Sequence, residues 1–311
     1  MKNFLYSLFL FLIPTLIYAE DGSKLWLRYQ PLSAKQVKSL SMGISSIVSE
    51  EPGDCTAITE LQDAWKQLTG KELPVVASLK DYSLVIGTEK SKLIQSLGLQ
   101  KELQTLGNDG FIIRTMKSKG NKITVIASKG ENGLLYAVFN LLRNIQLYVP
   151  SSNILRTIQL SSSPFTFYIK EVPSYKIRIL NHWDNLDGTI ERGYAGHSLW
   201  KWDELPGKLS PRYKEYARAN ASIGINGTVL NNVNASPEIL SNAYLQKVKA
   251  LAEVFRPYGI RVYLSVNFSS PTALGGLPTS DPLNESVQQW WKDKAKEIYG
   301  LIPDFGGFLV K

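Results

Sequence analysis

The sequence predicts an α/β protein built from a small mixed α/β domain followed by the first half of a (β/α)8 barrel. Two observations predict this class. Between residues 24 and 148, helical periodicity and alternating strand patterns are mixed, and from Ser174 onward short apolar runs alternate with amphipathic helices. Regular alternation of strand and helix is typical of parallel β/α units. The 311 residues are sufficient for about two globular domains.

The N-terminus has the features of a secretory signal. Lys2 precedes an apolar stretch at 4–17, and Ala19 supplies the small residue expected at a cleavage site. We expect residues 1–19 to be a signal peptide and the mature protein to be exported, periplasmic or extracellular, without a membrane segment. A membrane anchor needs about 20 apolar residues and is the weaker alternative. Cys55 is the only cysteine, which excludes an intramolecular disulfide.

Residues 20–150 form the predicted N-terminal domain. The strand patterns are LWLRY, SLVIGT and the two halves of a hairpin that turns at Lys119-Gly120-Asn121. Helical spacing covers residues 57–68, closed by Gly70, and residues 134–145. The stretch SKGENGLL precedes the second helix but lacks the GxGxxG and GK[ST] patterns, so it predicts a turn and helix start rather than a phosphate site.

Residues 151–311 carry the predicted barrel strands. The apolar runs are KIRIL (176–180), GTVL (227–230), RVYLSV (261–266) and GFLV (307–310). Helix patterns between them cover 213–223, 245–258 and 287–301; Ser210-Pro211 and Asn284 begin the first and third. Polar residues follow the strands, namely Asn181, His182, Trp183 and Asp184, then Asn231 and Asn232, then Asn267, then Lys311. Barrel active sites lie at these carboxyl ends.

A complete barrel needs eight strands, and the sequence stops one residue after the fourth run. We therefore expect a fragment truncated after strand 4, because an open half-barrel leaves unpaired strand edges. A four-stranded open α/β sheet is the alternative.

Composition excludes several classes of function. The formal charge is +8, but lysines and arginines are interspersed with acids, which argues against nucleic-acid binding. Only His182 and His197 are present, so a multi-histidine zinc site is excluded. A site of two histidines and a carboxylate is the weaker alternative, and we expect no metal and no cofactor.

Four long stretches carry a family resemblance. They are LNHWDNLDGTIERGYAG, ARANASIGINGTVLNNVNA, LSVNFSSP with GGLPTSDP, and WWKDKAKEIYGLIPDFGGFLVK. These stretches resemble the family 67 glycoside hydrolases, the α-glucuronidases of xylan degradation. The resemblance implies an N-terminal α/β domain, a central (β/α)8 barrel and a C-terminal helical domain, of which this chain supplies the first and half of the second. It also implies that full-length relatives form homodimers.

The resemblance also implies a substrate and a set of site residues. Family members release α-1,2-linked glucuronic acid, or its 4-O-methyl form, from xylooligosaccharides with inversion. By position, Trp183 lines the uronic-acid pocket, Val233 shapes it near the O4 substituent, and Lys311 binds the uronate carboxylate. Asn232, Asn267 and Asp184 are further substrate-binding candidates. The family's acid and bases lie beyond Lys311, so no catalytic residue is expected in this chain, which we expect to be inactive alone.

Carboxylates within the chain support two alternatives. Asp184, Asp187 and Glu191 invite assignment as an acid–base pair, but an inverting glycosidase needs two carboxyls about 6.5–9.5 Å apart across the scissile bond, and spacing along one loop does not establish that. We expect these three to be structural, with Asp184 pairing to His182 or Arg192. A β-hexosaminidase-like enzyme would need an adjacent Asp-Glu pair at a strand end, whereas Asp203-Glu204 lies in a loop. An inactive sugar-binding remnant is the non-enzyme alternative.

Overall fold

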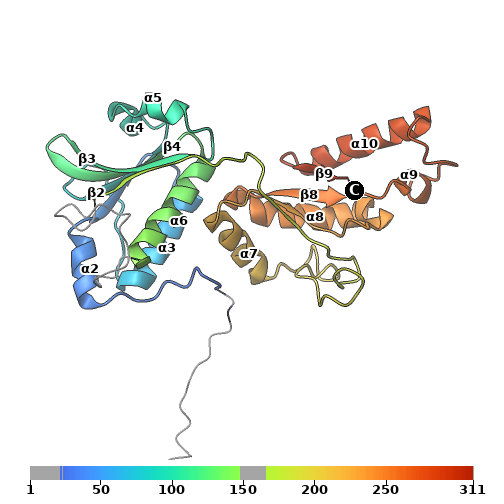
Figure 1. Cartoon of the computed structure of the whole chain (residues 1–311), viewed down its shortest axis with the longest axis horizontal. Coiled ribbons are helices and arrows are strands. Elements are labelled where there is room, and N and C mark those ends of the chain that lie inside the picture. The colour runs from blue at the N-terminus through green and yellow to red at the C-terminus, as the bar shows by residue number, and fades with distance from the viewer. Residues whose placement is uncertain (1–21, 23, 148–165, 311) are drawn as a thin grey trace, which may run out of the picture.

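The computed structural model describes residues 22, 24–147 and 166–310, which form two sheets, each with its own helices (Figure 1). The predicted signal peptide, the predicted domain boundary at residue 150 and Lys311 lie outside these residues. Among the helices described, none is both long and apolar enough to span a bilayer.

The first sheet is mixed, with strand order β1-β2-β4-β3-β5. Strands β1, β2 and β4 are parallel, and β3 runs antiparallel to both β4 and β5. Their bounds are β1 Ser46–Ser49, β2 Ser83–Thr88, β3 Phe111–Ser118, β4 Asn121–Ser128 and β5 Tyr168–Glu171. Every residue of β2 is buried, as expected for a central strand that is covered on both faces.

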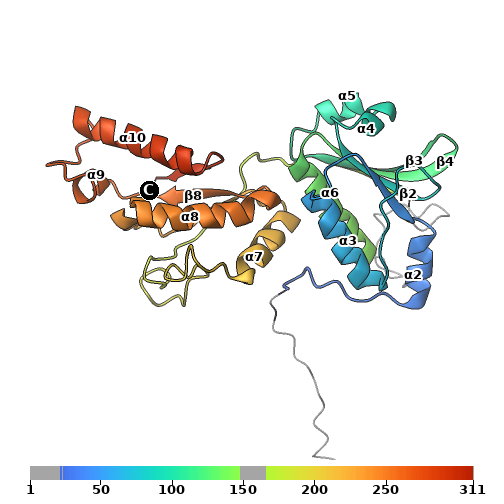
Figure 2. The ribbon, with the colours of Figure 1, turned by 180° about the vertical axis from the view of Figure 1, so that it is seen from behind.

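Helices cover both faces of this sheet. Helices α3 (Thr56–Thr69) and α6 (Glu131–Leu147) lie side by side on one face, while α4 (Lys92–Ser96) and α5 (Gln100–Gln104) lie on the other (Figures 1 and 2). Two apolar cores result, because alternate residues of a strand point to opposite faces. Leu84 and Ile86 belong to the core under α3 and α6, and Val85 belongs to the core under α4 and α5. Helix α2 (Ala34–Ser41) precedes β1.

Most predicted elements of this region are confirmed. Helix α3 ends at Gly70, whose φ of 71° is the left-handed C-cap expected of glycine. The hairpin turns through Lys119 and Gly120, with φ of 48° and 82°. Helix α6 begins at Glu131, within SKGENGLL, and its Gly133 packs so closely that a Cβ there would lie 2.6 Å from the Gly110 carbonyl oxygen.

The predicted strand LWLRY is wrong. Residues 24–26 form a turn and residues 27–30 have no regular secondary structure. The alternating pattern has a different cause: Leu27 and Tyr29 are buried in the first core, and the Tyr29 hydroxyl donates to Glu60 of α3 at 3.0 Å. The indole of Trp26 donates to the Ser222 hydroxyl at 2.7 Å. The segment therefore packs through its side chains against two helices and pairs with no strand among the described residues.

The second sheet consists of four parallel strands in sequential order, β6-β7-β8-β9. They span Ile179–Asn181, Gly227–Val229, Arg261–Ser265 and Gly307–Leu309. Helices α7 (Pro211–Ser222), α8 (Asn242–Phe255) and α10 (Glu285–Leu301) connect them, as predicted. Shorter elements are η1 (Pro237–Leu240), η2 (Arg256–Tyr258) and α9 (Ser270–Ala273).

The first strand of this sheet begins later than the sequence predicts. KIRIL was expected to be strand from residue 176, but β6 starts at Ile179, opposite Gly227. On the neighbouring segment, residues 223–224 form the turn after α7 and residues 225–226 have no regular secondary structure. Residues 176–178 therefore have no strand beside them to pair with. Instead the Arg178 amide donates to the side-chain oxygen of Asn226 at 2.9 Å.

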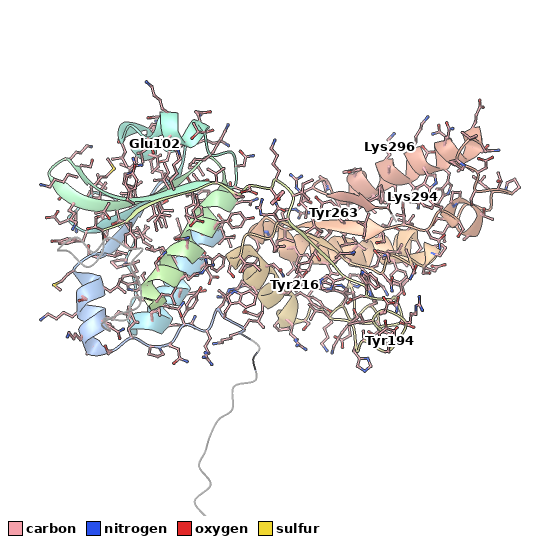
Figure 3. The ribbon with its side chains drawn as sticks, viewed as in Figure 1. Glu102, Tyr194, Tyr216, Tyr263, Lys294 and Lys296 are labelled. Carbon is pink, nitrogen blue, oxygen red and sulfur yellow. The ribbon has the colours of Figure 1, made fainter. Side chains whose placement is uncertain are left out.

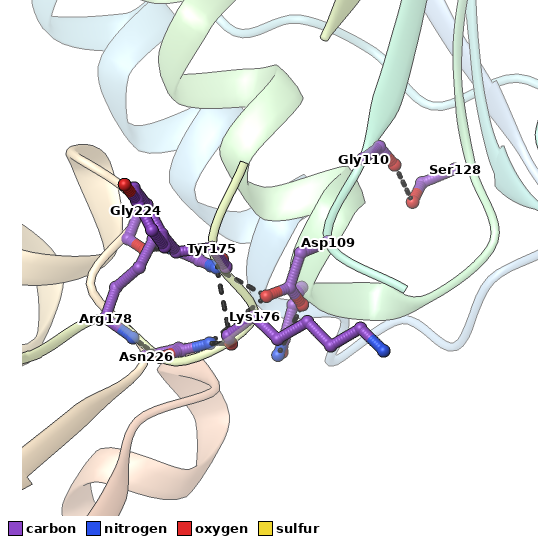
Figure 4. A network of polar contacts seen from close by, with 9 residues as sticks. Asp109, Gly110, Ser128, Tyr175, Lys176, Arg178, Gly224 and Asn226 are labelled. Atoms are coloured by element: carbon purple, nitrogen blue, oxygen red, sulfur yellow. Dashed lines mark hydrogen bonds and ion pairs between the residues drawn. The ribbon is translucent and has the colours of Figure 1, made fainter. Parts of the chain in front are cut away.

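Asp109, in the loop before β3, joins the two sheets. Its Oδ2 accepts from the Arg178 guanidinium at 2.7 Å and from the Asn226 amide at 3.2 Å (Figure 4). Its Oδ1 lies 3.5 Å from the Asn132 amide nitrogen, and Asn132 itself packs against Gly259. Residues 178 and 226 immediately precede β6 and β7, and residue 259 lies two positions before the start of β8. The first domain therefore contacts the amino ends of three strands of the second sheet.

Candidate functional site

The candidate site lies at the carboxyl edge of the second sheet, where the polar residues that follow the strands were predicted to gather. Side chains alternate in direction along β6 and the residues after it. His182 and Asp184 are turned toward α7 and the Trp200 loop, whereas the Trp183 side chain is 42% exposed on the opposite side.

His182 and Asp184 belong to one connected polar chain. Nδ1 of His182 lies 3.5 Å from Asp184 Oδ1, and Nε2 lies 2.8 Å from the hydroxyl of Tyr216. Tyr216 belongs to α7 and is labelled in Figure 3. The Tyr216 hydroxyl lies 2.9 Å from that of Thr228 on β7. Burial, with a smaller contribution from Asp184, raises the pKa of Tyr216 above its usual range. These polar contacts therefore link the loop after β6 to helix α7 and strand β7.

Asp184 is itself almost fully buried and uses both carboxylate oxygens. Besides the His182 contact, Oδ2 accepts from the Ser198 hydroxyl at 2.5 Å. The predicted pairing of Asp184 with His182 is confirmed. The alternative partner, Arg192, pairs with Glu191 instead, with its Nε 3.7 Å from Glu191 Oε1. Sequence reasoning missed Tyr216 and Ser198, because both are far from Asp184 along the chain and carry no motif.

The loop from 184 to 198 is held by side-chain and backbone hydrogen bonds within it. The carboxylate of Asp187 accepts from the Thr189 amide (2.9 Å) and hydroxyl (2.7 Å), which lowers the pKa of Asp187. Gly188 has a φ of 84°, so the predicted Asp187-Gly188 turn is confirmed. The backbone amide of Glu191 donates to the Trp183 carbonyl at 2.9 Å, which places the two residues side by side.

Asn232 and Asn267 also hold backbone. The Asn232 amide donates to Asn185 Oδ1 at 3.0 Å and to the Glu191 carbonyl at 3.2 Å. The Asn267 amide donates to the Ala235 carbonyl at 2.9 Å, and its oxygen accepts from Ser269. Each asparagine thus ties the loop after its own strand to the loop after the preceding strand.

Val233, the residue after Asn232, is half-buried. Of the three principal predicted residues, Trp183 and Val233 therefore lie in loops at the same sheet edge. Lys311 lies outside the described residues.

The Asp203-Glu204 pair and the possibility of a metal site remain to be described. Glu204 of the Asp203-Glu204 pair contacts Lys208 at 3.1 Å and Lys201 at 3.2 Å, and their hydrogen bonds lower the pKa of Glu204. It is thus part of a surface ion-pair cluster in the loop between β6 and α7. Across residues 22–147 and 166–310, apart from residue 23, no three His, Cys, Asp or Glu side chains are grouped to hold a metal ion.

Comparison with known proteins decides the family. The model of the glycosyl hydrolase family 67 N-terminus matches residues 25–141, and that of the family 67 middle domain matches residues 157–311. The chain belongs to glycoside hydrolase family 67. The resemblance drawn from the four sequence stretches is thereby confirmed.

Curated family 67 relatives are similar along nearly all of this chain. A probable α-glucuronidase A of Aspergillus terreus is 36% identical over 307 residues, which cover 96% of this chain and 34% of that protein. The α-glucuronidase A of Emericella nidulans is 35% identical over 326 residues, covering 100% of this chain and 36% of that protein. The chain therefore spans about a third of the length of the curated relatives it matches.

Solved structures share the fold at low sequence identity. A family 115 4-O-methyl-α-glucuronidase with specificity for decorated arabinogalactans superposes with a TM-score of 0.53 at 16% identity, covering 83% of this chain and 34% of that one. A family 138 enzyme targeting pectin rhamnogalacturonan II gives a TM-score of 0.50 at 14% identity, covering 84% and 30%. At this level of identity the similarity concerns the fold alone.

Proposed function

We propose that the chain is the N-terminal portion of an exported α-glucuronidase that hydrolyses α-1,2-linked glucuronic acid, or its 4-O-methyl form, from xylooligosaccharides with inversion. Family 67 membership supports the reaction class, and the relatives named α-glucuronidase support the bond that is cleaved. The acid and bases of the reaction lie beyond Lys311 in this proposal, so residues 1–311 alone are inactive.

The order of the second sheet supports its assignment as the first four strands of a barrel. Open doubly wound sheets reverse their strand order and place helices on both faces. Here β6, β7, β8 and β9 are neighbours in sequence order, and α7 contacts α8 as α8 contacts α10. Sequential strands with neighbouring outer helices are the pattern of a barrel.

The proposed substrate contacts are Trp183, Val233 and Lys311. The exposure of Trp183 at the carboxyl edge of the sheet is the observation that carries the proposal, because an aromatic face complements the apolar face of a sugar ring. Lys311 meets the uronate carboxylate as a point charge. Asp184, Asn232 and Asn267 were candidates for substrate binding; we propose that they act through loop geometry, since their polar atoms already bond to protein groups.

The test compares residues 20–311 with the same chain extended by the remaining barrel and C-terminal region of the Aspergillus terreus relative. Only the extended protein should release glucuronic acid from an aldouronic acid. In it, Trp183→Ala should lower kcat/KM by roughly 30- to 900-fold, the equivalent of about 2–4 kcal/mol for an aromatic anchor that the bound sugar covers.

Asp187→Asn is the matched control, because Asp187 holds a turn in the same loop and faces solvent; turnover by its folded fraction should be nearly unchanged. Release of glucuronic acid by residues 20–311 alone would overturn the proposal and return Asp184 and Glu191 to consideration. Sugar binding without hydrolysis by the extended protein would favour the binding-remnant alternative.

Export and assembly complete the proposal. Cleavage before Glu20 predicts that the secreted protein begins with that residue, which N-terminal sequencing of culture supernatant would check. The full-length protein is proposed to be a homodimer, which light scattering of the extended protein would test.

A further inference from the structure

A cavity of about 770 Å³ lies in the first domain, away from the candidate site. It is formed by the loops that follow β1, β2 and β4, the three parallel strands of the first sheet. The helices that follow these strands diverge: α3 and α6 lie on one face of the sheet and α4 on the other (Figure 1). Such divergence opens a crevice outside the carboxyl ends of the strands, which is where α/β sheets bind ligands.

The walls of this crevice are fixed before any ligand arrives. Glu51 Oε1 accepts from the Thr88 amide at 2.6 Å and from its hydroxyl at 2.9 Å. Glu50 Oε2 accepts from the Ser91 hydroxyl at 2.8 Å and from the Leu93 amide at 3.1 Å. The loop after β1 is thus linked to the loop after β2, so a ligand would not have to order these two loops on binding.

The chemistry of the lining selects the class of ligand. Besides serine, threonine and asparagine, it holds four glutamates and three lysines, namely Glu50, Glu51, Glu89 and Glu131, with Lys90, Lys92 and Lys129. Within the described chain none of these lysines forms an ion pair, so their ammonium groups can donate to a ligand. Because the glutamates outnumber the lysines by one, the crevice does not favour phosphate, despite the start of α6 at its rim. Aromatic residues are absent from the lining, which argues against a nucleobase.

We propose that this crevice binds a neutral polyhydroxylated ligand, a segment of an oligosaccharide chain. A sugar hydroxyl both donates and accepts hydrogen bonds, so a row of hydroxyls matches interspersed carboxylates and ammonium groups. The Asn132 rim of the crevice packs against Gly259, at the amino end of β8, whereas Trp183 lies at the carboxyl edge of that sheet. The crevice is therefore a second site, independent of the proposed hydrolysis, that would hold a chain away from the barrel mouth.

The test is an NMR titration of the 15N-labelled chain of residues 20–311 with xylohexaose as the probe. We expect shifts at Ser91, Gly130 and Glu131 that saturate with a Kd on the order of 1 mM, weak because no aromatic ring stacks on the sugar. Sodium phosphate should produce no saturable shift at the same residues.

The variant Lys92→Ala/Lys129→Ala should weaken xylohexaose binding about tenfold, since it removes two charged donors. Its control is Lys101→Ala/Lys117→Ala, which removes the same charge from exposed positions outside the crevice and should leave the Kd unchanged. Superposable spectra of the free variants show that both fold.

Three outcomes would overturn the proposal. They are no NMR shift at a xylohexaose concentration about ten times the expected Kd, saturable shifts with phosphate at the crevice residues, or xylohexaose shifts confined to Trp183 and its neighbours. If the variants do not fold, the map of shifts on the unsubstituted chain decides the matter alone. Loss of α-glucuronidase activity in the extended protein would leave this result untouched.

Discussion

The ion pair between Glu60 on α3 and Arg218 on α7 joins the two domains and should dominate the stability of their junction. The guanidinium donates twice to the carboxylate, at 2.8 and 2.6 Å, and the side chains are only 12% and 5% exposed for Arg218 and Glu60. Burial opposes the charge on Arg218, but Glu60 outweighs it and raises the pKa of the guanidinium above its ordinary value. The guanidinium of Arg218 therefore stays charged in this buried position.

Removal of either partner should have unequal costs. Arg218→Met leaves Glu60 buried with the Tyr29 hydroxyl as its remaining side-chain donor, so the free energy of unfolding should fall by about 3–5 kcal/mol. Glu60→Leu leaves Arg218 paired to Glu215 at 2.7 Å, a group 35% exposed, so the loss should be smaller, about 2–3 kcal/mol. The double variant buries no unpaired charge and should cost at least about 2 kcal/mol less than the sum.

Urea denaturation of residues 20–311, followed by far-UV circular dichroism and tryptophan fluorescence, measures these free energies. Lys66→Met is the control, because Lys66 and Glu72 form a pair at 2.6 Å whose side chains are 65% and 67% exposed, and its loss should leave the free energy of unfolding nearly unchanged. Strictly additive single and double variants, or a loss below about 1 kcal/mol for Arg218→Met, would refute the reasoning.

Three further predictions concern other parts of the chain. Gly133→Ala should lower the free energy of unfolding by about 1–3 kcal/mol, and with it the Tm, because the new Cβ would collide with the Gly110 carbonyl oxygen. Gly300→Ala should raise the Tm slightly, because Gly300 lies in open space near the end of α10. Differential scanning calorimetry separates the two variants. Arg114 holds the pKa of Glu102 below its ordinary 4.5, so the pair adds stability above pH 4.5 that is lost as the pH falls through the lower folded-state pKa. Glu102→Gln should flatten that acid-side decline in urea-measured stability, and an unchanged slope would contradict the assignment. Lys311→Ala in the extended protein should raise KM for a uronic-acid substrate more than for its glucose analogue, and equal effects on both would withdraw the role of Lys311.

The sequence predicted those elements whose signals are local. Helix α10 carries its own N-cap at Asn284, and the hairpin has its turn at Lys119-Gly120, so both follow from short-range chemistry. The strand order of the second sheet follows from the strand–helix alternation. The late start of β6 could not be predicted, because it depends on where Gly227 begins the partner strand.

The same distinction holds at the candidate site. Trp183 and Val233 are predicted as substrate contacts from the family motif and stay predictions, whereas the Asp187-Gly188 turn, predicted from local chemistry, is confirmed. Only half of the polar chain from Asp184 to Tyr216 was predicted. His182 and Asp184 are two positions apart in the sequence, so their contact is local, whereas Tyr216 belongs to α7 and is brought to His182 by the fold. LWLRY was misassigned because burial against helices produces the same alternation as pairing in a sheet.

The position of Asp109 has a consequence for biosynthesis. A ribosome completes the first domain before Arg178 and Asn226 have been made, and domains generally fold in that order. The Asp109 carboxylate of the folded first domain is then already in place where the amino ends of β6 and β7 are to be aligned. In the finished fold it lies 2.7 Å from its Arg178 donor and 3.2 Å from its Asn226 donor. The first domain would thus serve as a template on which the nascent barrel strands are set in register, and a chain made without it would have to find that alignment unaided.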